Sequence, residues 1–207
     1  MLGQLLDVAA PVFGIALMGY LFAGIRAVDL RSITDLVLDV TAPALVFASL
    51  AERAIEPGEM LGVGGGAIFQ SLACGALAWA VFSLARIRAR GLLLATMFPN
   101  TGNLGLPLAL FAFGDEGLAA AVIVFVSITL VHYTVGIAIV SGSMRPGVIL
   151  RTPLVYAAVL GLLLAFSGVT LPSPLLRGMR LLGDAAVPLM LLSLGVRMRS
   201  VAWAVPG

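Results

Sequence analysis

A run of helix-breaking residues interrupts a membrane-length apolar segment near the middle of this chain. Residues 97–113 read MFPNTGNLGLPLALFAF and contain two prolines, two asparagines and two glycines: Pro99, Asn100, Gly102, Asn103, Gly105 and Pro107. A lipid-spanning segment must satisfy its backbone groups internally, because the bilayer core holds no water. Proline removes an amide donor, and glycine weakens a helix. Irregular backbone at that depth is tolerated only inside protein or beside a wet cavity, so this run predicts a broken helix like those of transporters.

The composition predicts an integral membrane protein that uses neither cofactor nor metal. Hydrophobic residues make up 61% of the chain and charged residues 11%, whereas soluble domains carry about 25% charged residues. All twelve basic residues are arginines in scattered positions, which does not favour nucleic acid as a partner. One cysteine and one histidine cannot supply a disulfide or a zinc site. The absence of a GxxxxGK[ST] loop argues against ATP hydrolysis.

Apolar runs of about 20 residues predict an all-α polytopic protein with seven membrane spans. We place the spans at about 5–25, 33–51, 60–85, 91–113, 115–140, 152–170 and 176–196. The first span lacks the basic start and the short apolar run of a cleaved signal, so we expect it to be retained. The third span is rich in glycine, which predicts close packing inside the bundle.

The arginines predict the orientation in the membrane. With the N-terminus outside, nine of the twelve arginines fall on the inner side, and only Arg53, Arg177 and Arg180 fall outside. This distribution obeys the positive-inside rule. The expected location is therefore the plasma (inner) membrane of a bacterium, with residue 207 on the cytoplasmic side.

Two segments 145 residues apart suggest an internal repeat. LVLDVTAPALVFASL starts at Leu36 and LLGDAAVPLMLLSLG at Leu181, and each places an aspartate four residues before a proline: Asp39 with Pro43, and Asp184 with Pro188. The two spans run in opposite directions, as five-helix inverted repeats require. Residues 1–142 would form the first repeat, and 143–207 the first two helices of an inverted second one. A second break would fall beyond Gly207, which favours a truncated ten-helix protein over assembly with another subunit.

The break FPNTGNLGLPL, the segment DVTAPALVFASLA and the later LLGDAAVPLMLLSLG resemble the auxin efflux carrier family of membrane transporters, which includes bacterial permeases for malonate and similar acids. The resemblance covers nearly the whole chain and matches a member without its C-terminal third. It implies ten spans in two inverted five-helix repeats, with crossover helices broken at proline. The binding site would lie where these helices cross.

The chemistry of the break predicts a substrate site for an anion. Each proline leaves a carbonyl four residues earlier without its helical donor, so Pro43, Pro107 and Pro188 would free the carbonyls of Asp39, Asn103 and Asp184. A helix starting near Asn103, with Asn103 as N-cap, would point unpaired amide donors at the membrane midplane and attract a carboxylate. The predicted substrate-binding residues are Asn100, Thr101, Gly102, Asn103 and Gly105, with Pro99 in the break.

Three titratable residues inside the spans are candidates for ion or proton coupling: Asp39, Asp184 and His132. Burial would raise the pKa of Asp39 and allow it to exchange protons. Each candidate also has a structural interpretation. Asp184 lies one turn from Arg180, and His132 could be a hydrogen-bonded packing residue. Asp35 is expected to pair with Arg31 at the interface.

The leading hypothesis is a secondary-active transporter for small organic anions, driven by protons or another ion. A homodimer is left open. A sodium-coupled transporter of the bile-acid type and a non-transporting sensor or fragment are the alternatives. An intramembrane aspartyl protease using Asp39 and Asp184 is disfavoured, because its Pro-Ala-Leu motif at 43–45 would precede the second aspartate and no Tyr-Asp pair occurs.

Overall fold

The computed structural model describes residues 2–52, 57–87, 89–143, 147, 151–167, 169 and 171–202, and these residues form helices without a strand. The helices are α1 (Leu2–Ile25), α2 (Leu30–Leu36), α3 (Ala42–Ala51), α4 (Pro57–Leu84), α5 (Arg90–Met97), α6 (Leu106–Val131), α7 (Ile137–Ser141), α9 (Pro153–Ser167), α10 (Ser173–Asp184) and α11 (Ala186–Ala202). Three π-helical turns join consecutive helices: η1 (Val37–Thr41), η2 (Thr101–Gly105) and η3 (His132–Gly136).

Five helical stretches among the described residues are long and apolar enough to cross a membrane, which confirms the all-helical membrane class. They are Leu5–Ile25, Leu30–Ala51, Gly58–Leu84, Arg90–Ser141 and Ser173–Val201, and Pro153–Ser167 is a shorter apolar helix. The sequence predicted seven spans, and the difference of two has two sources: Arg90–Ser141 counts as one stretch where two spans were expected, and Pro153–Ser167 is shorter than the span expected at 152–170. A straight helix of the 52 residues Arg90–Ser141 would be about 78 Å long. Gly114, at φ 66° and ψ −155°, breaks that stretch with a non-helical turn.

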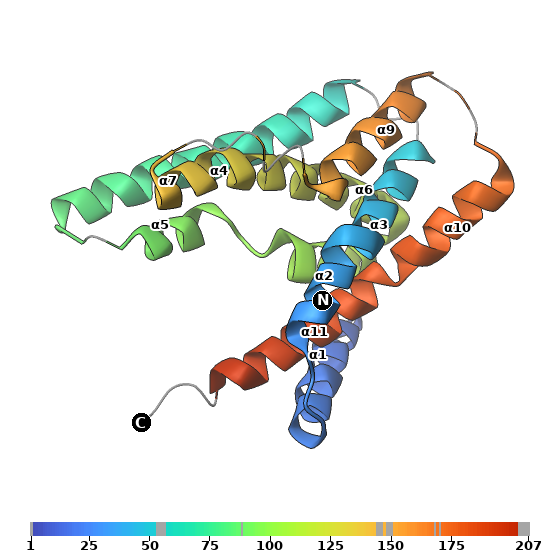
Figure 1. Cartoon of the computed structure of the whole chain (residues 1–207), viewed down its shortest axis with the longest axis horizontal. Coiled ribbons are helices and arrows are strands. Elements are labelled where there is room, and N and C mark those ends of the chain that lie inside the picture. The colour runs from blue at the N-terminus through green and yellow to red at the C-terminus, as the bar shows by residue number, and fades with distance from the viewer. Residues whose placement is uncertain are drawn as a thin grey trace.

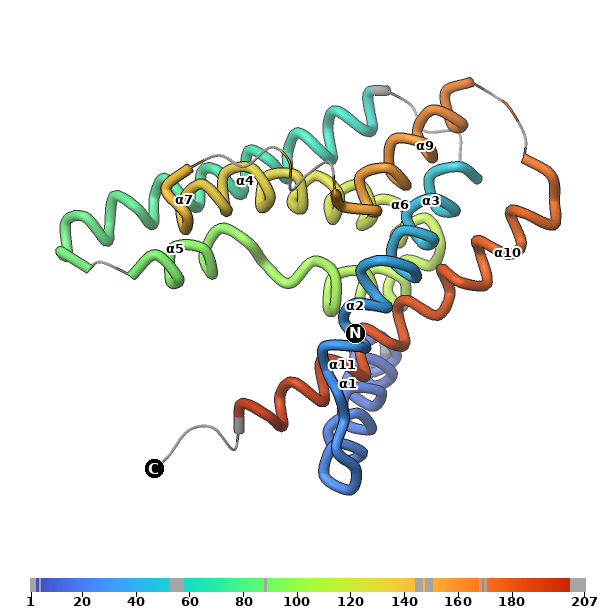
Figure 2. Tube along the Cα trace, in the orientation of Figure 1, coloured from blue at the N-terminus to red at the C-terminus, as the bar shows by residue number. Residues whose placement is uncertain are grey.

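The helices form two groups, which Figures 1 and 2 show in the same orientation. In one group α4 packs against α5 and α6, and α5 contacts α7. In the other α1 packs along α11, and α3 packs against α9 and α10. Contacts of α6 with α1 and α3, and of η2 with α11, join the two groups. The buried core therefore lies along the seam between α3 and α6, where Ala42, Val46, Leu106 and Val122 have no exposed surface.

The crossing of α1 and α11 depends on two glycines. A Cβ added to Gly195 would overlap the carbonyl oxygen of Ala16 and lie 2.7 Å from the backbone nitrogen of Tyr20. A Cβ on Gly19 would likewise meet the backbone of Leu192. Small residues let membrane helices approach this closely and gain dispersion energy. These two contacts fix how α11 is placed against α1.

The glycine-rich helix α4 is more exposed than the sequence predicted. Gly64 lies against α6, where its Cβ would be 2.9 Å from the Ser127 hydroxyl oxygen. Gly62, Gly65 and Gly66 have no neighbouring atom within 4 Å of an added Cβ. The expectation that α4 is packed inside the bundle is therefore wrong for most of its surface, because α5 and α6 cover only one side of it.

Asp29 caps helix α2 at its start. Its carboxylate accepts the backbone N–H of Arg31 at 3.1 Å and also accepts the hydroxyl of Ser32. These two hydrogen bonds, the hydroxyl first, lower the pKa of Asp29 from its ordinary value. One turn further along, Arg31 and Asp35 form the expected ion pair at 3.9 Å. Both charged groups thus lie at the end of the span, while Asp39 lies deeper along it.

Candidate functional site

The predicted helix break lies between α5 and η2. Helix α5 ends at Met97, and Phe98 and Asn100 have the non-helical ψ angles of 92° and 70°. Residues 98–100 run extended before the chain coils again at Thr101, as the tube in Figure 2 shows. Pro99 favours this geometry, because the residue before a proline is forced out of the helical region. The chain therefore leaves the helix where the sequence indicated.

The helix after the break is capped by Asn100, so the expectation that Asn103 is the N-cap is wrong. The Asn100 side-chain oxygen accepts the backbone N–H of Asn103 at 3.1 Å. The Asn100 backbone carbonyl also accepts the N–H of Gly105 at 3.1 Å, which closes a π-helical turn. The helix restarts three residues earlier than predicted, and this places Asn103 in its first turn.

The helix before the break is closed by a residue that the sequence reasoning did not assign to the site. The Ser71 hydroxyl on α4 donates to the carbonyl of Met97, the last residue of α5, at 2.9 Å. Both residues are buried. Gly75, one turn further on, leaves room for the Met97 side chain, since an added Cβ would lie 2.7 Å from its sulfur. A terminal carbonyl that the break leaves without a helical donor is thus satisfied from α4.

A cavity of about 260 Å³ opens beside the break. Its apolar wall includes Phe98, Pro99 and Phe125. The polar residues that line it come from η1, η2, α6, η3 and the start of α9: Asp39, Thr101, Thr129, His132, Tyr133, Arg151 and Thr152. The cavity thus holds one carboxylate, one guanidinium, one imidazole and several hydroxyls.

Three of the predicted site residues reach this cavity from π-helical turns. Asp39 lies in η1, Thr101 in η2 and His132 in η3. The π-helical conformation is found in well under 1% of residues; it occurs mostly as single turns within α-helices, and these turns are frequent at functional sites. Each turn widens its helix by one residue and re-aims the side chains it carries. The convergence of three such turns on one cavity is the main geometric feature of this site.

The environment of each candidate side chain differs from the sequence-based picture. Asp39 is exposed along the cavity, so the expectation that it is buried is wrong. The His132 ring packs edge-on against Phe98, with ring centroids 4.7 Å apart, and lies 5.8 Å from the Tyr133 ring. Arg151 was placed by sequence only on the inner side of the membrane, yet it lines the cavity. The sequence signal that could have identified Arg151 was its position two residues before Pro153, the proline that starts α9.

The other residues that the sequence predicted for the site do not line the cavity; they pack around the break or lie elsewhere in the helices. Gly102 packs against α6, because an added Cβ would lie 3.1 Å from the Phe125 ring. Gly105 has only ordinary contacts, the nearest at 3.6 Å to the Asn100 carbonyl. Pro43 and Pro107 are buried in the core, whereas Pro188 is exposed on α11. Asn100, Asn103 and Gly105 are not among the residues that line the cavity.

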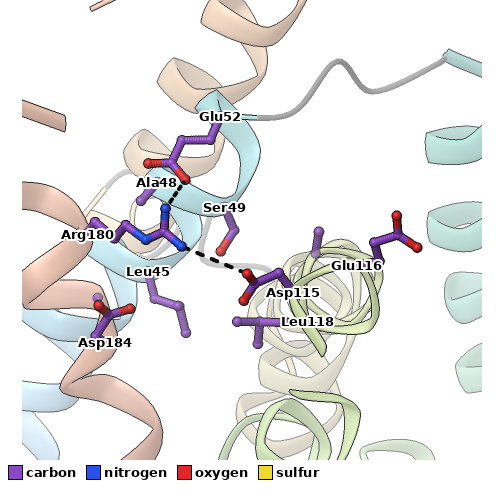
Figure 3. A pocket seen from close by; sticks show the side chains of 11 residues that line it. Leu45, Ala48, Ser49, Glu52, Asp115, Glu116, Leu118, Arg180 and Asp184 are labelled. Carbon is purple, nitrogen blue, oxygen red and sulfur yellow. Dashed lines mark hydrogen bonds and ion pairs between the residues drawn. The ribbon is translucent and has the colours of Figure 1, made fainter. Parts of the chain in front are cut away.

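Asp184 lies at a second cavity, of about 340 Å³, at the other end of the α3–α6 seam (Figure 3). Arg180 on α10 bridges two other elements there. It contacts Glu52 at the end of α3 at 3.4 Å and Asp115, next to the Gly114 turn, at 3.9 Å. The sequence had suggested Asp184 as the partner of Arg180. The ion pairs of Arg180 go to Glu52 and Asp115 instead.

Both cavities are lined by α6, and the first is also lined by η1, which continues directly into α3, the helix that lines the second. The α6 residues lining the second cavity end at Ala119, and those lining the first begin at Phe125, six residues or about 9 Å later. The fully buried Ala42 and Val122 lie in the interval between the cavities. Among the described residues no group of three His, Cys, Asp or Glu side chains could hold a metal ion.

Comparison with known proteins identifies similar sequences. The sequence model of the family described as "Membrane transport protein" matches residues 6–149 and 148–203. A curated relative from Methanocaldococcus jannaschii, named "Uncharacterized transporter MJ1031", is 30% identical over 213 residues. The match covers 92% of this chain and 68% of the relative.

Proposed function

Since the chain belongs to the membrane transport protein family, the auxin efflux carrier family that its sequence resembles, we propose that it is a secondary-active permease for small organic anions. Family and relative indicate a transporter rather than an enzyme. The observation that carries the proposal is the convergence of three π-helical turns and Arg151 on one cavity beside the helix break.

The cavity suits a small carboxylate. Its volume of about 260 Å³ lies just below the 300–1,000 Å³ range of pockets for drug-sized ligands. Arg151 offers planar paired donors that match a carboxylate. Thr101 stands at the start of a helix, where backbone N–H groups and the helix dipole favour negative charge. Substrate would therefore bind between Arg151 and the first turn of η2.

Asp39 and His132 are the coupling groups we propose at this cavity. Both line it, and both can gain or lose a proton. Because Arg151 lines the same cavity, a proton gained or lost by either group would change the net charge of the site. Asp184 faces the other cavity, beside Arg180, so we give it no part in substrate binding.

An inverted repeat accounts for a symmetry in the helix contacts. Helix α1 packs along α11, and α9 packs along α3, as expected if α1 corresponds to α9 and the α2–α3 span to α10–α11. Close contacts of single residues support the same relation. Gly195 meets Ala16, and Gly161 meets Leu50. Asp39 and Asp184 are 145 residues apart, and the same offset separates Ala16 from Gly161 and Leu50 from Gly195. Each close contact therefore joins residues that correspond to those of the other. We propose seven spans on this basis, divided at Gly114.

The two cavities are then opposite ends of one transport path. With the N-terminus outside, the Arg151 cavity opens toward the cytoplasm, and the Arg180 cavity lies on the outer side. The ion pairs of Arg180 hold three elements together at the outer end, and the apolar layer at Ala42 and Val122 separates the two cavities. Exposed ion pairs are weak, so this closure can open at little cost.

Uptake by the reconstituted chain tests the proposal. Radiolabelled mono- and dicarboxylates would be added outside the proteoliposomes under imposed proton or sodium gradients, and the label that enters would be counted. We expect Arg151→Gln to raise KM roughly 10- to 100-fold, the loss of a charged hydrogen bond, and Arg151→Lys to recover part of it. Arg26→Gln, on the same predicted side, is the matched control. Asp39→Asn should flatten the pH profile. Unchanged KM in Arg151→Gln would overturn the site, and dependence on sodium alone would favour the bile-acid type of coupling.

A further inference from the structure

The turn between α4 and α5 carries a third, basic cavity that the transport proposal does not use. It has a volume of about 980 Å³. Two guanidiniums and a hydroxyl line it, from Arg86, Arg90 and Ser83, and Trp79, Phe82 and Leu93 form an apolar wall. No acidic residue occurs in the sequence between Glu59 and Asp115. Glu59 is on α4 but lies in its first turn, about 36 Å along the helix from Ser83, so no carboxylate of α4 or α5 lies beside this basic turn.

The backbone of the hairpin is strained where it presents Arg86. Helix α4 ends in a Schellman arrangement, with the N–H of Ile87 donating to Phe82 at 2.8 Å and that of Arg86 to Ser83 at 3.2 Å. This motif places Arg86 in the left-handed region, at φ 56°, where glycine is the favoured residue. Within the described segments it is the one non-glycine residue with a positive φ. An arginine at a backbone position that favours glycine points to a function for its side chain.

The position of the cavity relative to the bilayer indicates what it binds. The 27-residue span Gly58–Leu84 is about 40 Å long, which exceeds the roughly 30 Å hydrocarbon core and carries its end to headgroup level. Trp79 is 65% exposed and Leu84 is 85% exposed beside the cavity. Such apolar side chains suit contact with acyl chains, and tryptophan favours the membrane interface.

We propose that this cavity binds the phosphate headgroup of an anionic membrane lipid. Arg86 and Arg90 contact the phosphate oxygens, Ser83 donates its hydroxyl, and Trp79 and Phe82 pack against the glycerol and upper acyl carbons. Arg90 also donates to the Val140 carbonyl at the end of α7, at 3.3 Å. A lipid seated here therefore fixes the α4–α5 turn against α7, on the helix group that carries the break.

Fluorescence quenching in nanodiscs tests the proposal on the whole chain. In a Trp203→Phe background, Trp79 is the remaining tryptophan. Brominated phosphatidylglycerol and brominated phosphatidylcholine would each be added at the same low mole fraction to a phosphatidylcholine bilayer. We expect preferential quenching by the anionic lipid, with a preference of roughly 5-fold for each arginine, which weakens as salt rises.

Substitutions distinguish the effect of the two arginines on lipid binding from their effect on folding. Glycine suits the left-handed backbone at this position, so the Arg86→Gly variant should fold at least as well as the parent. It should still lose the part of the preference for anionic lipid that Arg86 contributes. Arg90→Gln should lose a similar share, and Arg90→Lys should keep most of it. Arg26→Gln with Arg31→Gln is the matched control elsewhere on the surface. Equal quenching by the two lipids in the parent, or an unchanged preference in Arg86→Gly with Arg90→Gln, would overturn the proposal. Displacement of the lipid by millimolar inorganic phosphate would also overturn it, in favour of a soluble anion.

Discussion

Replacing Gly195 with alanine should destabilise the crossing of α1 and α11. The new methyl would overlap the Ala16 carbonyl oxygen and lie 2.7 Å from the Tyr20 nitrogen. Non-bonded heavy atoms pack best at about 3.5–4.0 Å, so relieving the clash with the carbonyl oxygen would require the two helices to separate by roughly 1.5 Å or more. Extra methylenes in a packed core cost about 1–3 kcal/mol. We expect the upper end here, because the obstacle is backbone, which cannot rotate away as a side chain can.

The gain in helix propensity partly offsets this cost. Alanine is favoured over glycine by about 1 kcal/mol inside a helix, which leaves a net loss of about 2 kcal/mol. For a chain of this size that corresponds to a fall in Tm of about 4–8 °C.

Thermal unfolding of the purified chain in detergent measures this loss. The control is Gly66→Ala on α4, where an added Cβ has no neighbour within 4 Å. It gains propensity without the clash, so its Tm should stay level or rise. Gly19→Ala, on the other side of the same crossing, should behave like Gly195→Ala. If Gly195→Ala melts no lower than Gly66→Ala, the close approach of α1 and α11 is not what stabilises this crossing.

Three further outcomes test the rest of the structure. Ser71→Ala leaves the buried Met97 carbonyl without its donor and should cost about 1–3 kcal/mol, measured as a lower Tm that Ser71→Thr restores. The hydrogen bonds that lower the pKa of Asp29 stabilise α2 above its unfolded pKa and fade as pH falls through the folded pKa. The Tm gap between the parent and Asp29→Asn should therefore close in acid, and a gap independent of pH would refute this. Arg180→Gln breaks exposed ion pairs worth about 0.2–1 kcal/mol each, so Tm should change little while a cysteine placed at Ser49 reacts faster with an impermeant thiol reagent.

The sequence predicted the helix break because its cause is local. Pro99 and the residues around it disfavour a helix wherever the chain is placed, so their effect is readable without a partner. The choice of cap was not readable in the same way. Asn100 and Asn103 are equally good cap residues, and the path after Pro99 decided that Asn100 takes this place.

Contacts between distant segments could not be predicted. The sequence alone grouped Arg180 with its helical neighbour Asp184, because residues four apart share a helix face. The fold instead brings Glu52 and Asp115 to Arg180. Arg151 likewise gained its place at the cavity from the packing of α9 against α3.

The sequence by itself therefore determined that this is a helical membrane protein, which family it belongs to and where the helix breaks. These follow from hydropathy, from proline and glycine, and from motifs that act within a few residues. The tertiary structure decided that Asp39, Thr101, His132 and Arg151 face one cavity while Asp184 faces another. The physical reason is that helix crossings, set by close contacts such as the one at Gly195, determine which side chains meet. Such contacts join residues far apart in the chain and leave no periodic signal in it.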